Sequence, residues 1–291
     1  MPAPDGPRVS IDGHTRLAFL LGYPVSHSAS PAMHRAAFAA AGVNGAYLPW
    51  AVAPAHLPAA VEGLRSMENL LGANVTVPHK EAVVPLLDDL TPEAEAIGAV
   101  NTVIPRSGRL VGDNTDGAGF LAALQEELGC RPEGLTAAVL GAGGAARAVA
   151  AALARRGVRR VVVVNRTASR AEALAAHLTA RCPGCDIAVQ TLHSSWQASQ
   201  VPEIRLLVNT TSVGLHPGDP PLFDYDSLPA EVVVADLIYR PAETPLLRAA
   251  RRRGCRAANG LGMLVHQGAL AFECWTGVPA PVQAMRDAVG S

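Results

Sequence analysis

A glycine-rich turn between a short apolar run and a helical pattern constrains the fold of this chain more than any other feature. The run Ala137-Ala138-Val139-Leu140 leads directly into Gly141-Ala142-Gly143-Gly144-Ala145-Ala146, and a helical pattern then continues to about Arg156. Glycine at the first and third positions permits a sharp bend and lets a bound pyrophosphate approach the free N–H groups at the helix start. A glycine-rich turn alone is a weak signal, but a strand, this turn, a helix and a second strand together predict a doubly wound, Rossmann-like domain.

Apolar runs later in the chain supply the other strands of such a domain. The candidate strands are residues 136–140, 161–165, 187–190, 205–209, 232–236 and 256–258. Helical patterns or loops separate these runs, which is typical of parallel strands joined by crossover helices. The second part of the chain is therefore expected to form a nucleotide-binding sheet.

The first part of the chain alternates between strands and helices in the same way. Strands are expected at 17–22, 46–52, 71–77 and 99–105, and helices at 31–41 and 57–66. For the first of these helices, Ser30 fits the N-cap and Gly42 fits the position after the C-cap. Pro78 is expected to open another helix with Lys80 in its first turn, and Thr91 is expected to cap a short helix. These patterns predict an α/β domain with a mixed, mainly parallel sheet.

The length of 291 residues is too great for one ordinary core and favours two domains. Residues 1–116 are expected to form the first domain, and the helices of residues 259–291 are expected to return to it and complete it. Residues 117–258 are expected to form the nucleotide-binding domain. The active site is expected in the cleft between the two domains.

Charge and composition exclude several classes of function. A net charge of −1 and a pI near 6.8 give no basic surface for nucleic acid or for an anionic membrane. No apolar stretch of about 18 residues and no secretory leader is found, so the protein is expected in the cytoplasm. Five cysteines do not make a disulfide framework, Cys182-Pro183-Gly184-Cys185 is interpreted as a turn, and no metal site is expected. The first residues, to about residue 15, are expected to form a loose tail.

The end of the second strand in the nucleotide-binding domain indicates which dinucleotide is bound. Residues 161–164 lead into Asn165-Arg166-Thr167, and Arg170 follows one helical turn later. An NAD site carries an acidic residue near this position for the ribose hydroxyls, whereas two guanidiniums and a hydroxyl suit a 2′-phosphate. Like charges four residues apart on a helix repel each other unless an anion lies between them. The sequence therefore predicts NADP rather than NAD.

Thr210, Thr211 and Ser212 follow the fourth strand of the same domain, at the carboxyl edge where cofactors bind. Contact with the cofactor is the preferred interpretation, and an ordinary Ser/Thr turn is the alternative. The glycine-rich turn has a similar alternative, which is a tight bend in a sheet that binds nothing.

One lysine stands among the 24 basic residues of the chain, and all the others are arginines. This lysine is Lys80, at the end of the run Asn74-Val75-Thr76-Val77-Pro78-His79-Lys80. Arginine stays protonated in proteins, whereas a lysine ammonium can give up a proton and regain it. The lone lysine therefore indicates a site that needs an exchangeable proton. The alternative is that it is a chance survivor of an arginine-rich composition.

Several motifs in order give the chain a close resemblance to one enzyme family. They are residues 22–31 (GYPVSHSASP), 74–80 (NVTVPHK), 99–102 (AVNT), 112–117 (GDNTDG) and 259–267 (NGLGMLVHQ). From about residue 17 to residue 275 the chain resembles the shikimate dehydrogenases, and several independent motifs are more specific than one glycine-rich turn. The resemblance implies reversible reduction of 3-dehydroshikimate to shikimate with NADPH, on the pathway to chorismate and the aromatic amino acids.

The resemblance also implies roles for individual residues. Lys80 and Asp116 correspond to the family's catalytic pair, and a positioned acid accelerates proton transfer by roughly 10²- to 10⁴-fold. For substrate binding, the resemblance implies that the hydroxyls of Ser28 and Ser30 bind the carboxylate and that Tyr239 lines the cleft. The ring hydroxyls, which require short polar side chains, are expected to bind Thr76, Asn101, Asp116 and Gln267. With the residues argued above, the expected cofactor site comprises Gly141, Ala142, Gly143, Gly144, Ala145, Asn165, Arg166, Thr167, Arg170, Thr210, Thr211, Ser212, Gly260 and Met263.

Other interpretations remain open from the sequence. A relative that oxidises both shikimate and quinate differs in pocket volume, and a non-catalytic NADP sensor would have no need of both Lys80 and Asp116. A protein of the methylenetetrahydrofolate dehydrogenase type shares a two-domain plan with a lysine, but the paired serines and residues 113–117 argue against it. Asp116 alone would be interpreted as a helix N-cap, and His79 is expected to point away from the site. The protein is expected to bind small molecules, with neither nucleic acid nor membrane as a partner, as a monomer or homodimer.

Overall fold

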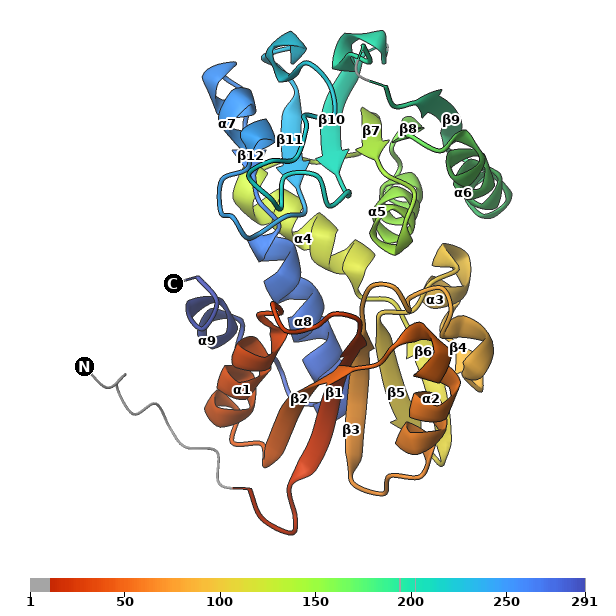
Figure 1. Ribbon diagram of the computed structural model, residues 1–291, viewed down its shortest axis with the longest axis vertical. Helices are drawn as coiled ribbons and strands as arrows, with labels where there is room; N and C mark the ends of the chain where they lie inside the picture. Colours follow the sequence, from red (N-terminus) through yellow and green to blue (C-terminus); the bar gives the residue numbers. More distant parts are fainter. Residues whose placement is uncertain (1–10, 194, 202, 291) are drawn as a thin grey trace, which may run out of the picture. The chain divides into compact units, whose positions relative to one another are not determined.

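The structure is a computed structural model that describes residues 11–193, 195–201 and 203–290 (Figure 1). Residues 1–10 of the predicted loose tail lie outside the described residues. The chain divides into two compact units: unit 1 comprises Met1–Thr115 with Val265–Ser291, and unit 2 comprises Asp116–Leu264. The chain thus crosses into unit 2 after Thr115, whereas the sequence analysis predicted the crossing after Asp116. The return lies inside the helix Leu261–Thr276 rather than at residue 259.

Unit 1 is built on a sheet of six strands in the order β2-β1-β3-β5-β6-β4. The strands are β1 (Arg16–Gly22), β2 (Gly45–Ala51), β3 (Leu70–Val75), β4 (Asp89–Leu90), β5 (Thr102–Arg106) and β6 (Arg109–Asp113). Strand β1 is parallel to β2 and β3, and β4 is parallel to β6, while β5 is antiparallel to both of its neighbours. The prediction of a mixed, mainly parallel sheet is confirmed.

Helices pack on both faces of this sheet. They are α1 (Ser30–Ala40), α2 (Leu57–Arg65), α3 (Pro92–Ile97), the later part of α8 (Leu261–Thr276) and α9 (Val282–Asp287), with short 3-10 turns η1 (Pro54–His56) and η2 (Val84–Leu86). On one face, Ala73 of β3 packs in a cluster with Val61 of α2. On the other face, Gly72 leaves the space that Trp275 of α8 fills, and the Trp275 indole donates to the Val103 carbonyl at 3.1 Å. Because neighbouring residues of a strand point to opposite faces, β3 is enclosed by helices on both sides.

The predicted helix from Pro78 is absent, and this prediction was wrong. Residues 77–83 form consecutive turns instead. Pro85 has no backbone N–H and disfavours α-helical geometry at Val84, so the turns pass into η2 and then into β4. Lys80 therefore lies in a turn and not in the first turn of a helix.

The start of α1 also differs from the prediction, because Ser30 is not the N-cap. Ala29 occupies that position without a side-chain hydrogen bond, and Ser30 is the first helical residue. The Ser28 hydroxyl accepts a 3.2 Å hydrogen bond from the Ser30 amide, which satisfies one of the free N–H groups of the helix start. At the other end, Gly42 has a φ of 65° directly after the C-cap Ala41, as predicted.

Unit 2 holds a second sheet of six strands with parallel pairings, in the order β12-β11-β10-β7-β8-β9. The strands are β7 (Thr136–Leu140), β8 (Arg160–Asn165), β9 (Asp186–Thr191), β10 (Ile204–Asn209), β11 (Val233–Asp236) and β12 (Ala257–Ala258). The strand order reverses between β7 and β10, which is the topology of a doubly wound nucleotide-binding fold. The predicted fold class is confirmed.

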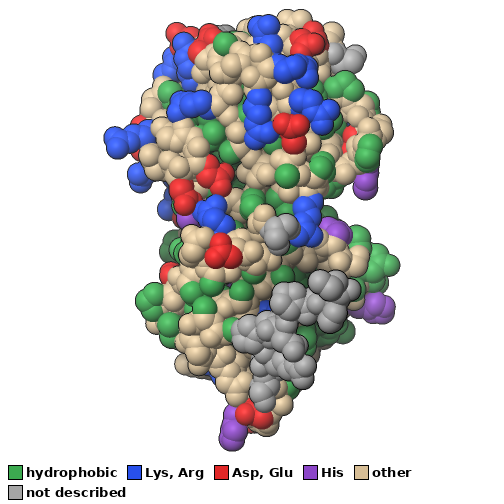
Figure 2. Space-filling view, turned by 90° about the vertical axis from the view of Figure 1, so that its left-hand side faces the viewer, with side chains coloured by type: hydrophobic (Ala, Val, Ile, Leu, Met, Phe, Trp, Pro, Cys, Tyr) green, Lys and Arg blue, Asp and Glu red, His purple; other side chains and the backbone are tan. Residues whose placement is uncertain are grey.

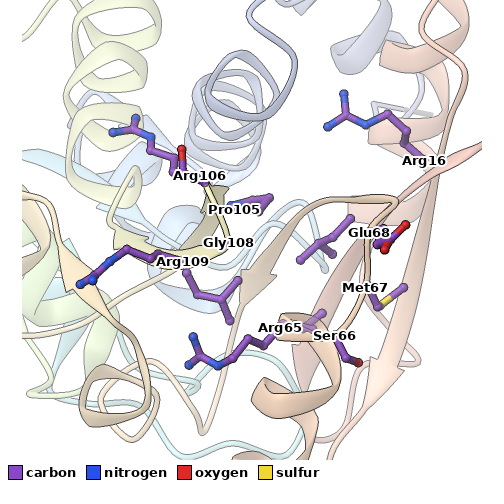
Figure 3. Close-up of a pocket in the computed structure, with 13 residues that line it drawn as sticks. Arg16, Arg65, Ser66, Met67, Glu68, Pro105, Arg106, Gly108 and Arg109 are labelled. Carbon is purple, nitrogen blue, oxygen red and sulfur yellow. The ribbon is translucent and has the colours of Figure 1, made fainter.

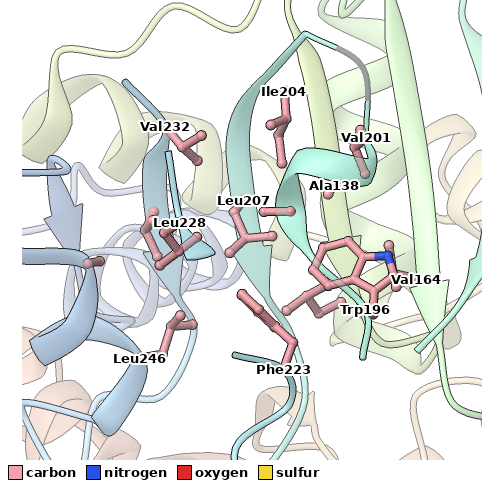
Figure 4. Close-up of a cluster of buried hydrophobic side chains, with 14 of the residues drawn as sticks. Ala138, Val164, Trp196, Val201, Ile204, Leu207, Phe223, Leu228, Val232 and Leu246 are labelled. Atoms are coloured by element: carbon pink, nitrogen blue, oxygen red, sulfur yellow. The ribbon is translucent and has the colours of Figure 1, made fainter. Parts of the chain in front are cut away.

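The helices of unit 2 and a large apolar cluster hold this sheet in place. The helices are α4 (Asp116–Leu128), α5 (Gly144–Arg155), α6 (Ala168–Arg181) and α7 (Pro245–Arg252), with 3-10 turns η3 (Ala198–Gln200) and η4 (Tyr225–Ser227). Helices α4 and α5 pack so closely that a Cβ on Gly117 would lie 2.8 Å from the Cβ of Ala152. In the cluster of Figure 4, Trp196 and Phe223 meet edge to face with ring centroids 5.0 Å apart. Such packing gives the strand ends a rigid support.

The surface carries charges of both signs. On the face shown in Figure 2, basic side chains are spread over unit 2 with acidic side chains among them. Some form exposed pairs, such as Arg248 with Glu243 at 3.2 Å, and such pairs contribute little to stability. Within the described residues, no helix combines the length and the apolar character needed to cross a membrane.

Candidate active site

The predicted substrate-binding residues of unit 1 follow the carboxyl ends of its central strands. Strand β1 ends at Gly22 and leads to Ser28 and Ser30, while β3 leads directly to Thr76. The Thr76 amide donates to the Leu21 carbonyl at 2.8 Å, which ties the ends of β1 and β3 together. Ser30 is buried, and Ser28 and Thr76 are half-buried. The fold therefore places these hydroxyl groups at one edge of the sheet.

A network of buried and half-buried hydrogen bonds joins further polar residues at this edge. The Asn101 side-chain amide donates to the side-chain oxygen of Gln267 at 3.3 Å and to the Thr115 hydroxyl at 3.0 Å. The Thr115 hydroxyl also lies 3.0 Å from the Gln267 backbone carbonyl, to which it can donate. The Thr115 amide and the Thr102 hydroxyl each donate to the Asn101 side-chain oxygen at 2.8 Å. Two predicted substrate-binding residues, Asn101 and Gln267, are thus brought together across 166 residues of sequence.

Asn74 extends this network into the core of unit 1. Its side-chain nitrogen donates to the Asn101 carbonyl at 3.1 Å, and its oxygen accepts from the Tyr47 hydroxyl at 2.9 Å. The Tyr47 ring stacks on His34 with centroids 4.3 Å apart. Burial lowers the pKa of His34 to about 3, against the opposing influence of the Asn74 side chain, so the imidazole is neutral near pH 7. The polar network therefore lies on a packed, uncharged support.

Lys80 lies in the turn that follows β3, beside the same network. Its backbone carbonyl accepts a 2.8 Å hydrogen bond from the amide of Val100, the residue before Asn101. The Lys80 residue is half-buried. The neighbouring His79 is buried, and its Nε2 lies 2.6 Å from the Val52 carbonyl, so its ring is held in the core. This geometry agrees with the interpretation that His79 points away from the site.

Two predicted site residues, Asp116 and Tyr239, belong to unit 2. Asp116 directly follows Thr115 and is the first residue of α4, where free N–H groups favour a carboxylate. It is buried, with 4% of its surface exposed. Tyr239 follows the end of β11 and is half-buried, and the carbonyl of the preceding Ile238 accepts from the Gly260 amide at 3.1 Å.

The glycine-rich turn of unit 2 lies at the carboxyl end of β7, where the strand order reverses. Gly141 has a φ of 114°, and its amide donates to the Val164 carbonyl at 2.8 Å. Gly143 is the N-cap of α5, and a Cβ added to it would meet no atom within 4 Å. The space beside Gly143 is therefore open to a group that approaches the first amides of α5. These residues fit the pyrophosphate of a dinucleotide.

Arg166 and Arg170 lie exposed after β8 and at the start of α6. Neither guanidinium forms an ion pair with another residue in the described part of the chain. The turn between them and the strand is closed by the Asn165 side chain, which donates to the Thr167 carbonyl at 2.9 Å. Because the two charges repel each other, an anion between them would be attracted, and a phosphate has the geometry for guanidinium binding.

The loop after β10 is held against the glycine-rich turn. The Thr210 hydroxyl donates to the Leu140 carbonyl at 2.7 Å, and a Cβ on Gly141 would lie 2.6 Å from that hydroxyl. Asn209 fixes Thr211, because the Asn209 side-chain oxygen accepts from the Thr211 amide at 3.0 Å and from its hydroxyl at 2.8 Å. Two of the predicted cofactor-binding segments are therefore adjacent within unit 2.

The remaining predicted cofactor residues are Ser212, Gly260 and Met263. Ser212 is exposed in the loop after β10, whereas Met263 is buried in the first turn of α8. Gly260 passes so close to the end of β11 that a Cβ on it would overlap the Leu237 backbone. A glycine is therefore required where α8 begins beside this strand end.

A pocket of about 370 Å³ in unit 1 lies away from these residues (Figure 3). It is lined by Arg16 at the start of β1 and by the turn between β5 and β6, at the opposite end of the strands from the predicted site. Two of its arginines are already paired, Arg65 with Asp88 and Arg109 with Asp89. Because of its position and these ion pairs, the pocket is not part of the candidate active site.

No group of three or more His, Cys, Asp or Glu side chains in the described ranges is placed to hold a metal ion. Cys182 and Cys185 are buried, and the Cys185 amide donates to the Cys182 carbonyl at 3.1 Å. Burial raises the pKa of the Cys185 thiol to about 11, which makes this thiol a weak nucleophile near pH 7. The segment is a turn, as interpreted from the sequence.

Sequence reasoning missed Thr102, Thr115 and Tyr47 as parts of the site. One signal was available, because two of the three Asn-Thr pairs of the chain, residues 101–102 and 114–115, stand close together in sequence. Strands β5 and β6 pair antiparallel with Thr102 opposite Asp113, which brings both pairs to one edge. Tyr47 offered no such signal, since an aromatic residue in an apolar strand pattern is typical of a core position.

Comparison with known proteins identifies a family over nearly the whole chain. The model of the shikimate dehydrogenase substrate binding domain matches residues 20–103, that of shikimate / quinate 5-dehydrogenase matches residues 124–195, and that of the shikimate 5'-dehydrogenase C-terminal domain matches residues 260–289. A shikimate dehydrogenase (NADP(+)) from Symbiobacterium thermophilum is 51% identical over 278 residues, which cover 95% of this chain and 94% of the relative.

Solved structures give the same result. The crystal structure of shikimate 5-dehydrogenase from Thermus thermophilus in complex with NADP(H) and shikimate has a TM-score of 0.82 and 43% identity, and covers 94% of this chain and 98% of its own. Quinate dehydrogenase from Corynebacterium glutamicum in complex with NAD has a TM-score of 0.84 and 34% identity, with coverage of 94% and 98%.

Proposed function

Because the chain belongs to the shikimate dehydrogenase family, we propose that it interconverts shikimate and 3-dehydroshikimate with NADP as the cofactor. It is an NADP-dependent oxidoreductase that acts on a CH–OH group. The observation that carries the proposal is the hydrogen-bond network of Asn101, Thr115 and Gln267 beside the turn of Lys80, in which Asn101 and Thr115 are buried and Gln267 is half-buried. This network supplies preset polar groups for a ring with several hydroxyls. The reaction belongs to the pathway towards chorismate and the aromatic amino acids.

We assign the proton transfer to Lys80 and its electrostatic support to Asp116. When bound, NADPH supplies the hydride that the carbonyl carbon accepts. The Lys80 ammonium gives its proton to the carbonyl oxygen, and in the oxidation direction the neutral amine takes the proton from the reacting hydroxyl. In this assignment, the buried carboxylate of Asp116 supplies a negative charge that balances the ammonium.

We assign substrate binding to the polar groups at the strand ends. The hydroxyls of Ser28 and Ser30 bind the substrate carboxylate, while Thr76, Asn101, Gln267, Asp116 and Tyr239 bind or line the ring. The hydrogen bonds between Asn101, Thr115 and Gln267 hold these side chains in one orientation before substrate binds. Such preorganisation lowers the entropy lost on binding.

We assign the dinucleotide to unit 2. The amides at the start of α5 bind the pyrophosphate, Arg166, Thr167 and Arg170 bind the 2′-phosphate, and the residues after β10 contact the cofactor beside the glycine-rich turn. The guanidiniums of Arg166 and Arg170, which form no ion pair among the described residues, support NADP over NAD. We place the enzyme in the cytoplasm, because its cysteines in the described part of the chain are all free thiols. A monomer or a homodimer remains the proposed assembly.

An enzyme of dual specificity is the second candidate, because quinate dehydrogenase from Corynebacterium glutamicum shares 34% identity with this chain. Initial rates with shikimate and quinate, each measured with NADP⁺ and NAD⁺, separate the two candidates. Strong activity is expected only with shikimate and NADP⁺. Equal activity with quinate would favour dual specificity instead, and binding of NADP⁺ without any turnover would favour a sensor.

The variant Lys80→Arg tests the proton transfer in the same assay. It keeps the positive charge but cannot release a proton, so kcat is expected to fall about 100-fold or more while KM for shikimate changes little. Arg35→Lys is a control, since this exposed arginine of α1 has no role in the proposal. A near-normal kcat for Lys80→Arg would rule out the assigned role.

A further inference from the structure

Unit 2 contains a buried carboxylate that has no part in the chemistry proposed above. Asp236 is the last residue of β11 and is 1% exposed. One of its oxygens accepts from the Asn209 side-chain amide at 2.9 Å and from the Ile238 amide at 3.2 Å, and the other accepts from the Thr244 hydroxyl at 2.6 Å. Burial raises the pKa of Asp236, and these hydrogen bonds oppose the shift. A buried carboxylate with donors from three segments fixes those segments relative to one another.

Asn209 transmits this constraint to the loop after β10. Its side-chain nitrogen donates to Asp236 and, at 3.3 Å, to the Val213 carbonyl, while its oxygen accepts from the amide and hydroxyl of Thr211. An amide side chain has one donor end and one acceptor end, whereas an ionised carboxylate can only accept. Asp236, together with the Val213 carbonyl and the Thr211 amide, therefore fixes which end of Asn209 faces Thr211.

The loop that is fixed in this way lies against the glycine-rich turn. The Thr210 hydroxyl bonds to the Leu140 carbonyl, and Gly141 has no room for a side chain beside that hydroxyl. A change in the orientation of Asn209 would thus displace the loop at the place where the dinucleotide is proposed to bind.

The other side of Asp236 faces a different element. The Thr244 hydroxyl that donates to Asp236 also accepts from the Leu247 amide at 3.2 Å, and Thr244 is the N-cap of α7. The hydroxyl contact stabilises α7. Towards the loop after β10, Thr244 offers only its Cβ and methyl group, which lie beside Gly214 and which a valine keeps. Asn209, which bonds to one oxygen of Asp236, is therefore the test residue, and Thr244, which bonds to the other oxygen, is the matched control.

We propose that Asp236 is a positioning residue for NADP, which acts through Asn209 to hold residues 210–214 in the conformation that binds the cofactor. The inference rests on the proposed function, because it takes NADP as the ligand of this loop. Neither Asp236 nor Asn209 needs to touch the cofactor for this role.

The dissociation constant for NADPH, measured by its fluorescence, tests the proposal with full-length protein. Asp236→Ala and Asn209→Ala remove the contact towards the loop, and each is expected to raise the constant about tenfold. Thr244→Val removes the contact towards α7 at nearly constant shape and is expected to change the constant less than about twofold. The dissociation constant for shikimate is the folding control and is expected to stay unchanged in all three variants.

If Asp236→Ala does not fold, exchanging the two side chains in the double variant Asn209→Asp with Asp236→Asn, called the reversed pair, provides a second test. Asn209→Asp alone places two carboxylates side by side and is expected to weaken NADPH binding. Adding Asp236→Asn removes one of the two facing charges and restores a donor opposite an acceptor, while the bonds to the Val213 carbonyl and from the Ile238 amide stay lost. Part of the affinity is therefore expected to return relative to Asn209→Asp alone.

The outcomes separate this inference from the proposed function. An unchanged dissociation constant in a folded Asp236→Ala protein would overturn the inference, as would equal weakening by Thr244→Val or the absence of rescue in the reversed pair. Failure of the unaltered enzyme to bind NADPH or to oxidise shikimate would instead contradict the proposed function.

Discussion

Arg166 and Arg170 are exposed and unpaired in the described part of the chain, so their charges are available to a ligand. Replacing both with alanine is expected to raise KM for NADP⁺ about 100-fold, since each hydrogen bond to a charged group contributes roughly 1.5–3 kcal/mol. The rate with NAD⁺, which lacks the 2′-phosphate, is expected to change little. Initial rates with both cofactors check this prediction, with Arg248→Ala as the control, because Arg248 pairs with Glu243. A parallel loss with NAD⁺ would show that the two arginines do not select the 2′-phosphate.

His34 makes the stability of unit 1 depend on pH. Its pKa is lowered from 6.5 to about 3 by burial, so the unfolded chain takes up a proton at higher pH than the folded one. The stabilisation is complete above about pH 6.5 and is lost as the pH falls towards the folded pKa, by up to about 1.4 kcal/mol per pH unit. Urea unfolding at several pH values should show this slope, whereas His34→Phe, which keeps an aromatic ring on Tyr47, should lack it. Equal slopes for the two proteins would contradict the prediction.

Single residues also show where sequence reasoning reached its limit. The glycines of the dinucleotide turn were predictable because a positive φ at Gly141 and open space beside Gly143 are local requirements. The network of Asn101, Thr115 and Gln267 was only partly predictable. Gln267 accepts a hydrogen bond from Asn101, which lies 166 residues away in sequence, and no local sequence pattern predicts such a contact.

Among the elements, the short helix α3 allows a direct test of how much an N-cap side chain stabilises a helix. The Thr91 hydroxyl accepts from the Ala94 amide at 3.2 Å and donates to the Asp113 side chain at 2.5 Å, just before Asn114 and Thr115. Thr91→Ala removes both contacts and is expected to lower the free energy of unfolding of unit 1 by about 1–2 kcal/mol. Chemical denaturation followed by tryptophan fluorescence checks this value. Thr91→Ser keeps the hydroxyl and should recover most of the loss, and equal losses in both variants would refute a capping role.

Elements were predictable where local chemistry agreed with the final fold. Strands β7 and β8 follow from apolar runs that are buried on both faces, and α3 follows from Thr91 and Pro92. The segment after β3 was predicted as a helix because Pro78 suits a first helical turn. Pro85, seven residues further on, prevents that helix from continuing, because it has no backbone N–H.

At the scale of the whole molecule, each unit has its own six-stranded sheet and its own apolar cluster. The hydrogen bonds among Asn101, Thr115 and Gln267 lie within unit 1, and those that hold the loop after β10 lie within unit 2. A ligand that binds one unit therefore stabilises mainly that unit against local opening.

Hydrogen–deuterium exchange followed by mass spectrometry can test this separation. A ligand present at 100 times its dissociation constant adds about 2.7 kcal/mol to the unit that binds it, which slows exchange through opening of that unit by up to about 100-fold. NADP⁺ is expected to protect β7 and α5, and shikimate is expected to protect β3 and β5. NAD⁺ at the same concentration is expected to protect β7 and α5 less, because it offers no 2′-phosphate to Arg166 and Arg170. Equal protection of both units by either ligand would mean that they open as one cooperative body, and the assignment of separate binding roles would then need binding measurements on variants of each unit.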